Sequence, residues 1–488
     1  MATVELAQQE LLIGGRWTGA ADGTTFENPF PFTGEPVGMA AAAKREDAKA
    51  AVEAAHAAFG EWSRSAPAMR REILLKAADI LQSRAEEIAQ TVTEETGGTF
   101  GWGMFNVQLA SGMLREAGAQ AYGLVGEVIP SDVPGKLAMG VRAPAGVVVA
   151  IAPWNAPVIL STRSVATPLA YANTVVLKAS EQCPRTHAAV VNALVDAGLP
   201  DGVINLITND PADAADVVDE LITHPLTRRI NFTGSTKVGR IIAEKAGKHL
   251  KRVLLELGGK APMVVLADAD IDQAVKAANF GAFFHQGQIC MSTERAIVDK
   301  SLIDAFSSKL AERASGLKVG DPREPDTVIG PLVNKAAIER VTELVEDAKS
   351  KGAEILSGGA ADGPCFPPTV VKGVTPDMRL YTEESFGPVL AVMASDNADQ
   401  AVELANDTEY GLSAAVFGND VPAALEIAQR IESGICHVND TTVHDEPQMP
   451  FGGVKASGFG RFGGRAALEE FTELRWITVQ ELGREYPI

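Results

Sequence analysis

The stretch Val147-Val148-Val149-Ala150-Ile151-Ala152 decides the fold, because it is apolar at every position and ends at Pro153-Trp154-Asn155. A strand of this kind is typical of a parallel sheet with helices on both faces, since neither face meets water. Similar apolar runs occupy residues 174–178, 203–208 and 229–232, and stretches with helical spacing occupy 165–172, 186–197 and 212–223. This alternation predicts a Rossmann-like α/β domain.

A second alternating series begins after Lys260. Apolar, strand-like runs lie at residues 263–266, 295–298, 389–394, 413–417 and 437–439. Stretches with helical spacing lie at 271–284, 302–316, 335–351, 398–406 and 421–434. The pattern predicts a second, mostly parallel sheet.

The N-terminal region changes its pattern near residue 45. Residues 11–37 are rich in Gly, Pro, Thr and Asn, which predicts short strands and turns. Apolar residues then recur at helical spacing over 45–59, over 68–95, where Gly97-Gly98 ends the helical pattern, and over 103–120. The last stretch has one apolar stripe, made of Phe105, Leu109, Met113 and Leu114. We interpret this stripe as core packing rather than a substrate lining.

Length and charge limit what this chain can be. At 488 residues it is too long for one hydrophobic core and should form two or three domains. Its net charge of -20 argues against a nucleic-acid partner, because such proteins need clustered Lys and Arg. The N-terminus lacks the pattern of a signal peptide, and no apolar run reaches the roughly 18 residues that span a bilayer. We therefore expect a cytoplasmic protein with no membrane partner.

The four cysteines, Cys183, Cys290, Cys365 and Cys436, lie far apart. This spacing argues against a disulfide framework and against a structural zinc site, so we expect reduced thiols and no bound metal. Cys290 differs from the others because it lies between glycine-containing polar residues and an apolar, strand-like run. It is the candidate nucleophile, although a lone thiol is more often an inert core residue.

Two polar motifs follow predicted strands, at the sheet edge where ligands bind in open α/β folds. Asn155 can donate to a developing oxyanion, or it can cap the turn. Lys178 and Glu181 can hold the ribose hydroxyls of an adenosine, or they can form a surface ion pair.

Three further motifs can serve a nucleotide or a reaction, and each has an ordinary structural alternative. Gly234 and Ser235 open a helix whose N-terminus can hold a phosphate, or they form a capped strand-turn-helix. Glu256 stands in an apolar run before two glycines, where it can activate water or be a satisfied structural carboxylate. Glu384 and Phe386 can reach a ribose and a nicotinamide ring, or they form a turn.

Taken together and in this order, the motifs resemble the NAD(P)-dependent aldehyde dehydrogenase superfamily. The resemblance covers nearly the whole chain and rests on Pro153-Trp154-Asn155, Lys178 with Glu181, the motif at 232–235 with Gly239, the motifs at 256–260, 287–290 and 384–388, and the motif at 450–453 followed by Ser457-Gly458. It implies a Rossmann-type cofactor domain, an α/β catalytic domain and a small β oligomerisation element. Their expected bounds are 1–120 with 141–257 for the cofactor domain, 258–468 for the catalytic domain, and 121–140 with 469–488 for the oligomerisation element. The last pair overlaps two extended segments, 128–142 and 471–488, that fit neither α/β series and are candidates for subunit contacts.

The resemblance also implies a role for each motif. Cys290 is the nucleophile, Asn155 the oxyanion-binding amide and Glu256 the base that activates the hydrolytic water. The implied cofactor-binding residues are Trp154, Lys178, Ser180, Glu181, Gly234, Ser235, Gly239, Leu257, Glu384 and Phe386. A free thiol is mostly protonated at neutral pH, so Cys290 needs activation by Glu256, by Lys178 or by the cofactor, and the sequence does not rank these three.

Within the superfamily, the segments 289–295 and 438–464 resemble the branch that oxidises benzaldehyde, salicylaldehyde and vanillin. The resemblance implies a flat apolar slot lined by Ile289, Met291, Val443 and Phe451. Arg163 or His444 can then meet ring substituents; alternatively, Arg163 forms a structural ion pair and His444 is a solvated loop residue.

The carboxylate of Glu181 suits the 2′-hydroxyl of NAD and repels a 2′-phosphate, whereas Ser180 beside Lys178 softens that repulsion. We therefore expect NAD as the preferred cofactor with some use of NADP, a small aldehyde as substrate, and a homodimer or homotetramer. Three alternatives remain: specificity for aliphatic aldehydes or semialdehydes, acyl transfer to coenzyme A, which the presence of Glu256 disfavours, and a non-catalytic protein on the same fold.

Overall fold

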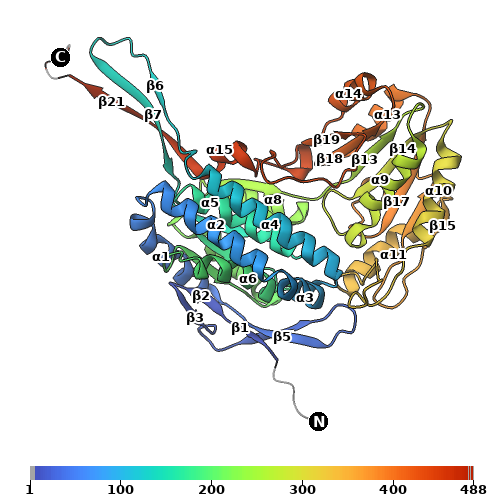
Figure 1. Ribbon diagram of the computed structural model, residues 1–488, viewed down its shortest axis with the longest axis horizontal. Coiled ribbons are helices and arrows are strands. Elements are labelled where there is room, and N and C mark those ends of the chain that lie inside the picture. Colours follow the sequence, from blue (N-terminus) through green and yellow to red (C-terminus); the bar gives the residue numbers. More distant parts are fainter. Residues whose placement is uncertain (1–5, 482, 484, 487) are drawn as a thin grey trace.

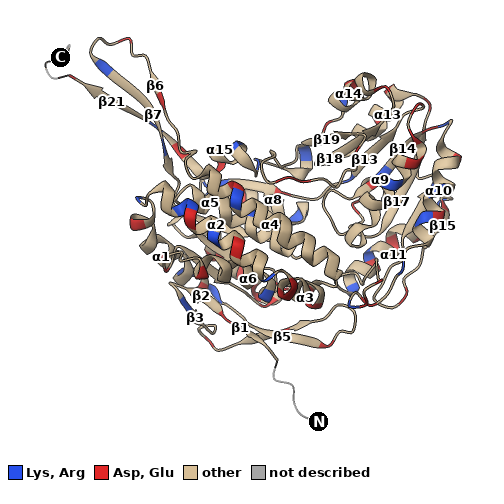
Figure 2. Cartoon of the chain, viewed as in Figure 1, with Lys and Arg blue, Asp and Glu red and all other residues tan. Residues whose placement is uncertain are grey.

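Two α/β lobes and a projecting three-stranded sheet make up the chain in the computed structural model, which describes residues 6–481, 483, 485, 486 and 488 (Figure 1). Acidic and basic side chains are interspersed over both lobes (Figure 2). Among the described residues, no helix combines the length and the apolar character needed to cross a bilayer.

The first lobe is built on an eight-stranded sheet. Its spatial order is β20 (Gly458–Phe459), β12 (Arg252–Glu256), β11 (Thr227–Thr233), β8 (Val147–Ile151), β9 (Thr174–Lys178), β10 (Ile204–Ile207), β2 (Leu11–Ile13) and β3 (Arg16–Thr18). The strands from β12 to β10 run parallel. Among these five parallel strands, the chain passes first from β8 outward to β9 and β10. It then crosses to the other side of β8, where β11 and β12 lie. The order therefore reverses between β8 and β11, which is where ligands bind in this class of sheet.

Helices cover both faces of this sheet, as the uninterrupted apolar runs predict. Val148 and Ala150 of β8 pack in one core cluster with α2 (Pro67–Ser83), α4 (Phe100–Gln120), α5 (Pro157–Ala170) and α6 (Pro184–Asp196). Val147, Val149 and Ile151 pack in another with α1 (Arg45–Trp62), α7 (Ala214–Thr223) and α8 (Thr236–Lys248). Alternate side chains of one strand thus serve two cores.

The second lobe has a seven-stranded sheet. Its spatial order is β15 (Glu354–Ser357), β16 (Thr369–Lys372), β17 (Val389–Ser395), β14 (Thr293–Asp299), β13 (Ala261–Val265), β18 (Ser413–Phe417) and β19 (Ile435–Val438). Only the pair of β15 and β16 among these described strands is antiparallel. One face carries α9 (Ile271–Phe283) and α10 (Ile303–Ser315), and the other carries α11 (Lys335–Ser350), α13 (Ala398–Asn406) and α14 (Val421–Arg430).

The remaining strands form two small sheets. At the N-terminus, β1 (Gln8–Gln9) and β4 (Thr25–Pro29) flank β5 (Pro36–Ala41). The second sheet, which we call the arm, consists of β6 (Glu127–Ile129), β7 (Lys136–Pro144) and β21 (Thr472–Gln480), and it projects from the body at the upper left of Figure 1. The arm leaves Val128, Leu474 and Trp476 exposed by 73%, 63% and 79%.

The α/β fold class is confirmed, but several predicted boundaries are wrong. The helical stretch at 68–95 is two helices, α2 and α3 (Ala85–Thr96), because Arg84 leaves the helical conformation with φ -103° and ψ 17°. Helix α5 begins at Pro157 instead of residue 165, since its first turns are buried on all sides and show no amphipathic period. Helix α14 ends at Arg430 because Ile431 is extended with ψ 127°. Strands β15 and β16 were not predicted.

Candidate active site

A cavity of about 480 Å³ lies at the carboxyl ends of the adjacent strands β8 and β11, between the two lobes. It contacts the loop after β8, the turn between β11 and α8, and residues of the second lobe. The cavity brings together eight of the residues selected from the sequence: Trp154, Asn155, Gly234, Ser235, Leu257, Cys290, Glu384 and Phe386. It also brings in residues that the sequence did not single out, among them Arg340 and Tyr410.

The loop that carries Cys290 has an unusual backbone. Residues 285–287 of the short helix η2 (Phe284–Gly287) have φ values of 49°, 56° and 69°, a region that non-glycine residues rarely adopt. Gln286 holds this loop, since its Nε2 donates to the carbonyl oxygens of Gly97 (3.0 Å) and Pro331 (3.1 Å). These contacts fix the loop, and with it the half-buried Cys290, to both lobes.

Asn155 is buried and oriented towards the same loop. Its side-chain Nδ2 donates to the backbone carbonyl oxygen of Gln288 at 2.9 Å, and its backbone carbonyl oxygen accepts from Nε1 of Trp102 at 3.1 Å. An amide nitrogen carries two hydrogens, so this geometry orients the group and leaves one N–H for an oxygen in the cavity.

Glu256, at the end of β12, is only 2% exposed. Among the described residues, neither of its carboxylate oxygens has a hydrogen-bond partner. Burial raises the pKa of Glu256 to about 8, against the opposing charges of Arg163 and Arg461. A carboxyl with this pKa exchanges its proton near neutral pH.

The same burial acts on the nucleophile. It raises the pKa of the Cys290 thiol to about 12, with a further contribution from the negative charge of Glu256 and an opposing one from Arg163. Lys178, one of the three candidate activators, is instead bound to Glu181, with 2.5 Å between Nζ and Oε1. Before substrate enters, the Cys290 site therefore favours the thiol over the thiolate.

Lys178 ends β9, the strand beside β8, and Ser180 and Glu181 follow it; none of the three lines the cavity itself. Glu181 also accepts a hydrogen bond from Nδ2 of Asn209 at 3.0 Å. Burial alone would raise the pKa of Glu181, but Lys178 outweighs it and holds that pKa below its ordinary value. Ser180 Oγ accepts from the backbone N–H of Gln182 at 3.3 Å, which is a local turn contact.

Ser235 caps helix α8, because its Oγ accepts from the backbone N–H of Val238 at 3.4 Å. The first turn of α8 faces the cavity and lies close to Leu257. A Cβ atom on Gly239 would be 2.4 Å from Cδ2 of Leu257, so only glycine permits this approach. Gly234 precedes the cap, and its N–H donates to the carbonyl oxygen of Glu256 at 2.9 Å.

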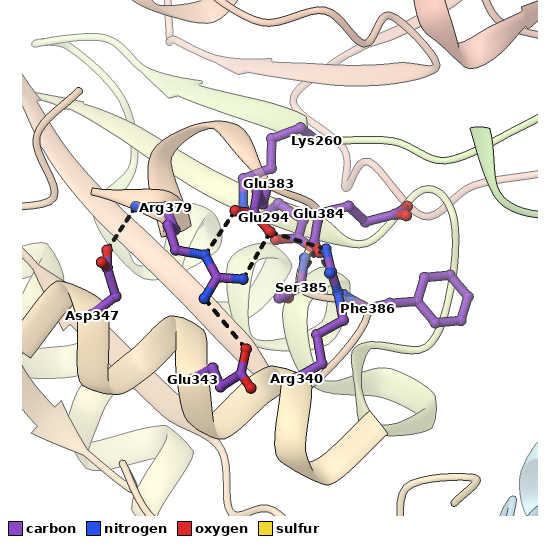
Figure 3. A network of polar contacts seen from close by, with 10 residues as sticks. All are labelled: Lys260, Glu294, Arg340, Glu343, Asp347, Arg379, Glu383, Glu384, Ser385 and Phe386. Atoms are coloured by element: carbon purple, nitrogen blue, oxygen red, sulfur yellow. Dashed lines mark hydrogen bonds and ion pairs between the residues drawn. The ribbon is translucent and has the colours of Figure 1, made fainter. Parts of the chain in front are cut away.

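Glu384 and Phe386 enter the cavity from the loop before β17. Glu384 Oε1 accepts from the backbone N–H of Gly259 at 2.7 Å, and burial raises the pKa of Glu384 to about 7. Phe386 has a left-handed backbone with φ 50°, and its ring meets Trp154 edge-on at 5.8 Å. Figure 3 shows both residues at one end of a network of polar contacts.

Four candidate substrate residues belong to the large apolar cluster of the first lobe or pack against it. Ile289, Met291 and Phe451 are buried in the same apolar cluster against which Cys290 and Val443 pack. None of these four side chains lines the cavity that contains Cys290, and the apolar slot expected from the sequence stays a prediction.

The two candidates for contact with ring substituents already have protein partners. Arg163 forms a buried ion pair with Asp445, and its guanidinium stacks over the Phe451 ring at 4.0 Å. His444 is 41% exposed and contacts Glu446 at 3.2 Å and Asp440 at 3.4 Å.

Comparison with known proteins identifies the family. A family model described as the aldehyde dehydrogenase family matches residues 17–477. The chain belongs to the aldehyde dehydrogenase family.

Several aldehyde dehydrogenases are similar over almost their full length. A vanillin dehydrogenase of Pseudomonas fluorescens is 56% identical over 478 residues, which cover 98% of this chain and 99% of that protein. The NAD(+) benzaldehyde dehydrogenase of Pseudomonas putida is 41% identical, covering 94% of this chain and 93% of the other. The crystal structure of a salicylaldehyde dehydrogenase from Pseudomonas putida G7 complexed with salicylaldehyde superposes with a TM-score of 0.97 at 44% identity, covering 99% and 100% of the two chains. The aldehyde dehydrogenase fold expected from the sequence is thereby confirmed.

Sequence reasoning missed residues around this aldehyde dehydrogenase site whose contacts are made across the fold. Asp445 pairs with Arg163 from 282 positions away, and Arg340 reaches the cavity from α11. Lys260 and Glu294 lie inside quoted motifs, but no charge pattern in the sequence indicates that they pair with each other.

Proposed function

We propose that this protein oxidises an aromatic aldehyde of the benzaldehyde, vanillin or salicylaldehyde type to its carboxylic acid, with NAD(P)⁺ as the oxidant. The observation that carries this proposal is the setting of Cys290, which lies in an apolar cluster, lines the cavity and is electrostatically coupled to the unpartnered Glu256. Flat apolar surroundings suit an aromatic ring, and the names of the relatives refer to aldehydes of this type.

Cys290 starts the reaction by adding its sulfur to the aldehyde carbon. Because burial and the charge of Glu256 raise the pKa of the thiol, its proton must leave as the carbon–sulfur bond forms. When Glu256 is deprotonated it can accept this proton, but its pKa of about 8 lies below that of the thiol, so the transfer is unfavourable unless the carbon–sulfur bond forms with it. The Asn155 amide and the backbone N–H of Cys290 then donate to the new oxyanion, a type of contact worth roughly a hundred-fold in rate.

Glu256 acts again after hydride transfer, when Cys290 carries the acyl group as a thioester. After Glu256 has released the thiol proton to solvent, its carboxylate takes a proton from a water molecule, which attacks the thioester carbon; the acid is released, and the leaving thiolate takes a proton to give the free thiol. The lack of a hydrogen-bond partner for its carboxylate oxygens among the described residues supports this role, because no other side chain engages either oxygen.

The residues around the cavity fit a nicotinamide dinucleotide. The N-terminus of α8 offers N–H groups and a positive dipole to a phosphate, with Gly234 and Ser235 beside it. Lys178 and Glu181 suit the adenosine ribose, while Glu384, Phe386 and Trp154 suit the nicotinamide side. The nicotinamide of a bound cofactor accepts the hydride that the aldehyde carbon loses.

We expect NAD to be preferred over NADP. The low pKa of Glu181 keeps a negative charge where a 2′-phosphate would lie, although the neighbouring Lys178 reduces the repulsion. Initial rates at equal, low concentrations of the two cofactors test this, and faster turnover with NADP would contradict it.

Product analysis tests the reaction itself. With vanillin and NAD⁺ but no coenzyme A, we expect equal amounts of NADH and vanillic acid. A requirement for coenzyme A would instead indicate acyl transfer, and cofactor binding without NADH formation from any aldehyde would indicate a non-catalytic protein.

We also propose that the arm and its neighbouring segments, at 121–140 and 469–488, form the oligomerisation element of a homodimer or homotetramer. The exposed Trp476, Val128 and Leu474 support this, because large apolar side chains on a projecting sheet are typical of an interface. The other proposed domains keep the bounds 1–120 with 141–257 for the cofactor and 258–468 for catalysis.

A further inference from the structure

One buried carboxylate outside the proposed chemistry touches the loop that carries Glu384 and Phe386. Glu294 lies on β14, four residues after Cys290, and is 3% exposed. Its Oε1 accepts three hydrogen bonds: from the N–H of Ser385 (2.9 Å), the hydroxyl of Ser385 (2.8 Å) and the N–H of Phe386 (3.1 Å). Its Oε2 binds Nζ of Lys260 at 2.7 Å. One side chain thus receives four donors (Figure 3).

The hydrogen bonds from Ser385 and Phe386 to Glu294, which we call the clamp, are needed because of the backbone conformation of this loop. Phe386 is a bulky residue in the left-handed region, a conformation that persists only where the surroundings enforce it. The hydrogen bond from its N–H to Glu294 fixes the peptide unit that enters this conformation. The ring is thereby directed to Trp154 in the cavity.

The ion pair with Lys260 explains how the carboxylate of Glu294 can be so deeply buried. The side chain of Lys260 is fully buried, and the charge of a buried lysine or glutamate is costly unless it is paired. The pair satisfies both charges and leaves the other oxygen of Glu294 for the loop. Two further contacts fix Glu384: its side chain accepts from Gly259, and its carbonyl oxygen accepts from Nη2 of Arg340 at 2.6 Å.

We propose that Glu294 is a positioning residue for the cofactor: held by Lys260, it fixes the loop of Ser385 and Phe386 in the shape that receives the nicotinamide side. The inference rests on the proposed function, because it takes the cavity to be the cofactor site. Glu294 touches neither cofactor nor substrate, so its effect passes through Phe386 and Glu384.

The variant Glu294→Gln tests the clamp. The glutamine amide has one acceptor oxygen and one donor nitrogen. Its NH2 group must therefore face either the Lys260 ammonium or the donors of the loop, and no hydrogen bond can form on that side. We expect the dissociation constant of NADH, measured by the fluorescence of the bound nucleotide, to rise about tenfold. The KM for NAD⁺ should rise with it, while the KM for the aldehyde and the rate of Cys290 alkylation by iodoacetamide stay unchanged.

Two variants accompany it. Glu343→Gln removes a carboxylate of the same network that is 64% exposed and contacts Arg379 instead of the loop, so NADH should bind as in the wild type. Ser385→Ala removes one donor without exposing a buried charge, and it should weaken NADH binding by about threefold. It decides the question if Glu294→Gln does not fold.

The outcomes separate this inference from the proposed function. If the wild type binds NADH and both Glu294→Gln and Ser385→Ala bind it equally well, the clamp is overturned and the proposed function is not. A lower melting temperature of the variants would not change this conclusion. Failure of the wild type to bind NADH would overturn the proposed cofactor site and the clamp with it.

Discussion

Burial disfavours the charged forms of both Cys290 and Glu256, and the negative charge of Glu256 further disfavours the thiolate of Cys290. The pKa of the thiol is raised to about 12 and that of the carboxyl to about 8. Removing the proton from Glu256 is therefore the easier step, and the carboxylate then becomes the acceptor for the thiol proton. This order ranks Glu256 above Lys178 as the activator, because Lys178 is bound to Glu181.

The variant Glu256→Gln should separate the two halves of the reaction. It keeps the shape of the side chain but cannot take a proton from water, so deacylation stalls at the thioester. Rapid mixing should show up to one NADH per active site, formed more slowly than in the wild type because the thiol proton must then pass to solvent, followed by turnover at least about a hundred-fold below wild type. Cys290→Ala should give no burst, and Cys436→Ala, which alters a thiol on β19, should behave as the wild type. Normal steady turnover by Glu256→Gln would contradict the assignment.

Glu256 should also affect how stability depends on pH. Its pKa is about 8 in the folded protein against an ordinary 4.5, so between these values the folded state holds a proton that the unfolded state releases. Its contribution to stability is therefore complete below pH 4.5 and is lost as pH rises through 8. Glu256→Gln does not ionise, and its free energy of unfolding relative to wild type should rise by a few kcal/mol between pH 5 and 8.5.

Urea unfolding at the two pH values measures this difference, and the exposed Glu343→Gln serves as the control. A constant difference between Glu256→Gln and wild type across this range would mean that the folded-state pKa of Glu256 is not raised.

Sequence motifs predicted many of the residues in the site. The sequence selected Cys290, Asn155, Glu384 and Phe386, and the structure brings all four to one cavity. It could not select Glu294 or Asp445, because their importance comes from contacts with residues far away in the chain. No residue-level pattern marks a buried ion pair before the fold is known.

At the scale of elements, the approach of α8 to Leu257, the residue after β12, shapes the phosphate side of the cavity. Gly239 permits this approach, since a Cβ there would lie 2.4 Å from Leu257. We expect Gly239→Ala to lower the free energy of unfolding by about 1–3 kcal/mol through overpacking. It should also raise the dissociation constant of NADH, because the helix N-terminus moves.

The same substitution on the same helix provides the control. A Cβ on Gly247 meets nothing within 4 Å, so Gly247→Ala should stabilise the protein by about 0.5–1 kcal/mol through helix propensity alone. Equal effects of the two substitutions would show that the contact with Leu257 does not matter.

Elements with a clear period were predicted well. Strands β9 and β18 and helix α13 begin and end at the predicted residues. The start of α5 was missed because a helix buried on all sides has no polar face to reveal its period. The division between α2 and α3 was missed because one residue, Arg84, changes the backbone while the apolar spacing continues.

At the scale of the whole molecule, the arm is the part least explained by a single chain. Its exposed apolar side chains should be covered in an oligomer. Trp476→Glu should therefore shift the sedimentation coefficient towards a smaller species. Leu425→Glu, an equally drastic change on exposed helix α14, should leave the sedimentation coefficient unchanged. An unaltered assembly of Trp476→Glu would contradict the role of the arm.

The division into lobes could be predicted only in part from the sequence. Alternation of strands and helices predicted two α/β sheets, and both are present. However, β20 returns from the C-terminal part of the chain to pair with β12 of the first lobe. A two-residue strand of Gly458 and Phe459 carries no sequence signal, since its position depends on Leu255 and Glu256, its partners in β12.

The central claim is that Cys290 and its apolar surroundings serve aromatic aldehydes. The most direct test is kcat/KM with NAD⁺ for benzaldehyde, vanillin and salicylaldehyde against hexanal and a semialdehyde. The account predicts that at least one aromatic aldehyde exceeds both aliphatic substrates by about tenfold or more, the scale set by apolar pocket contacts. Equal or higher kcat/KM for the aliphatic aldehydes would contradict it.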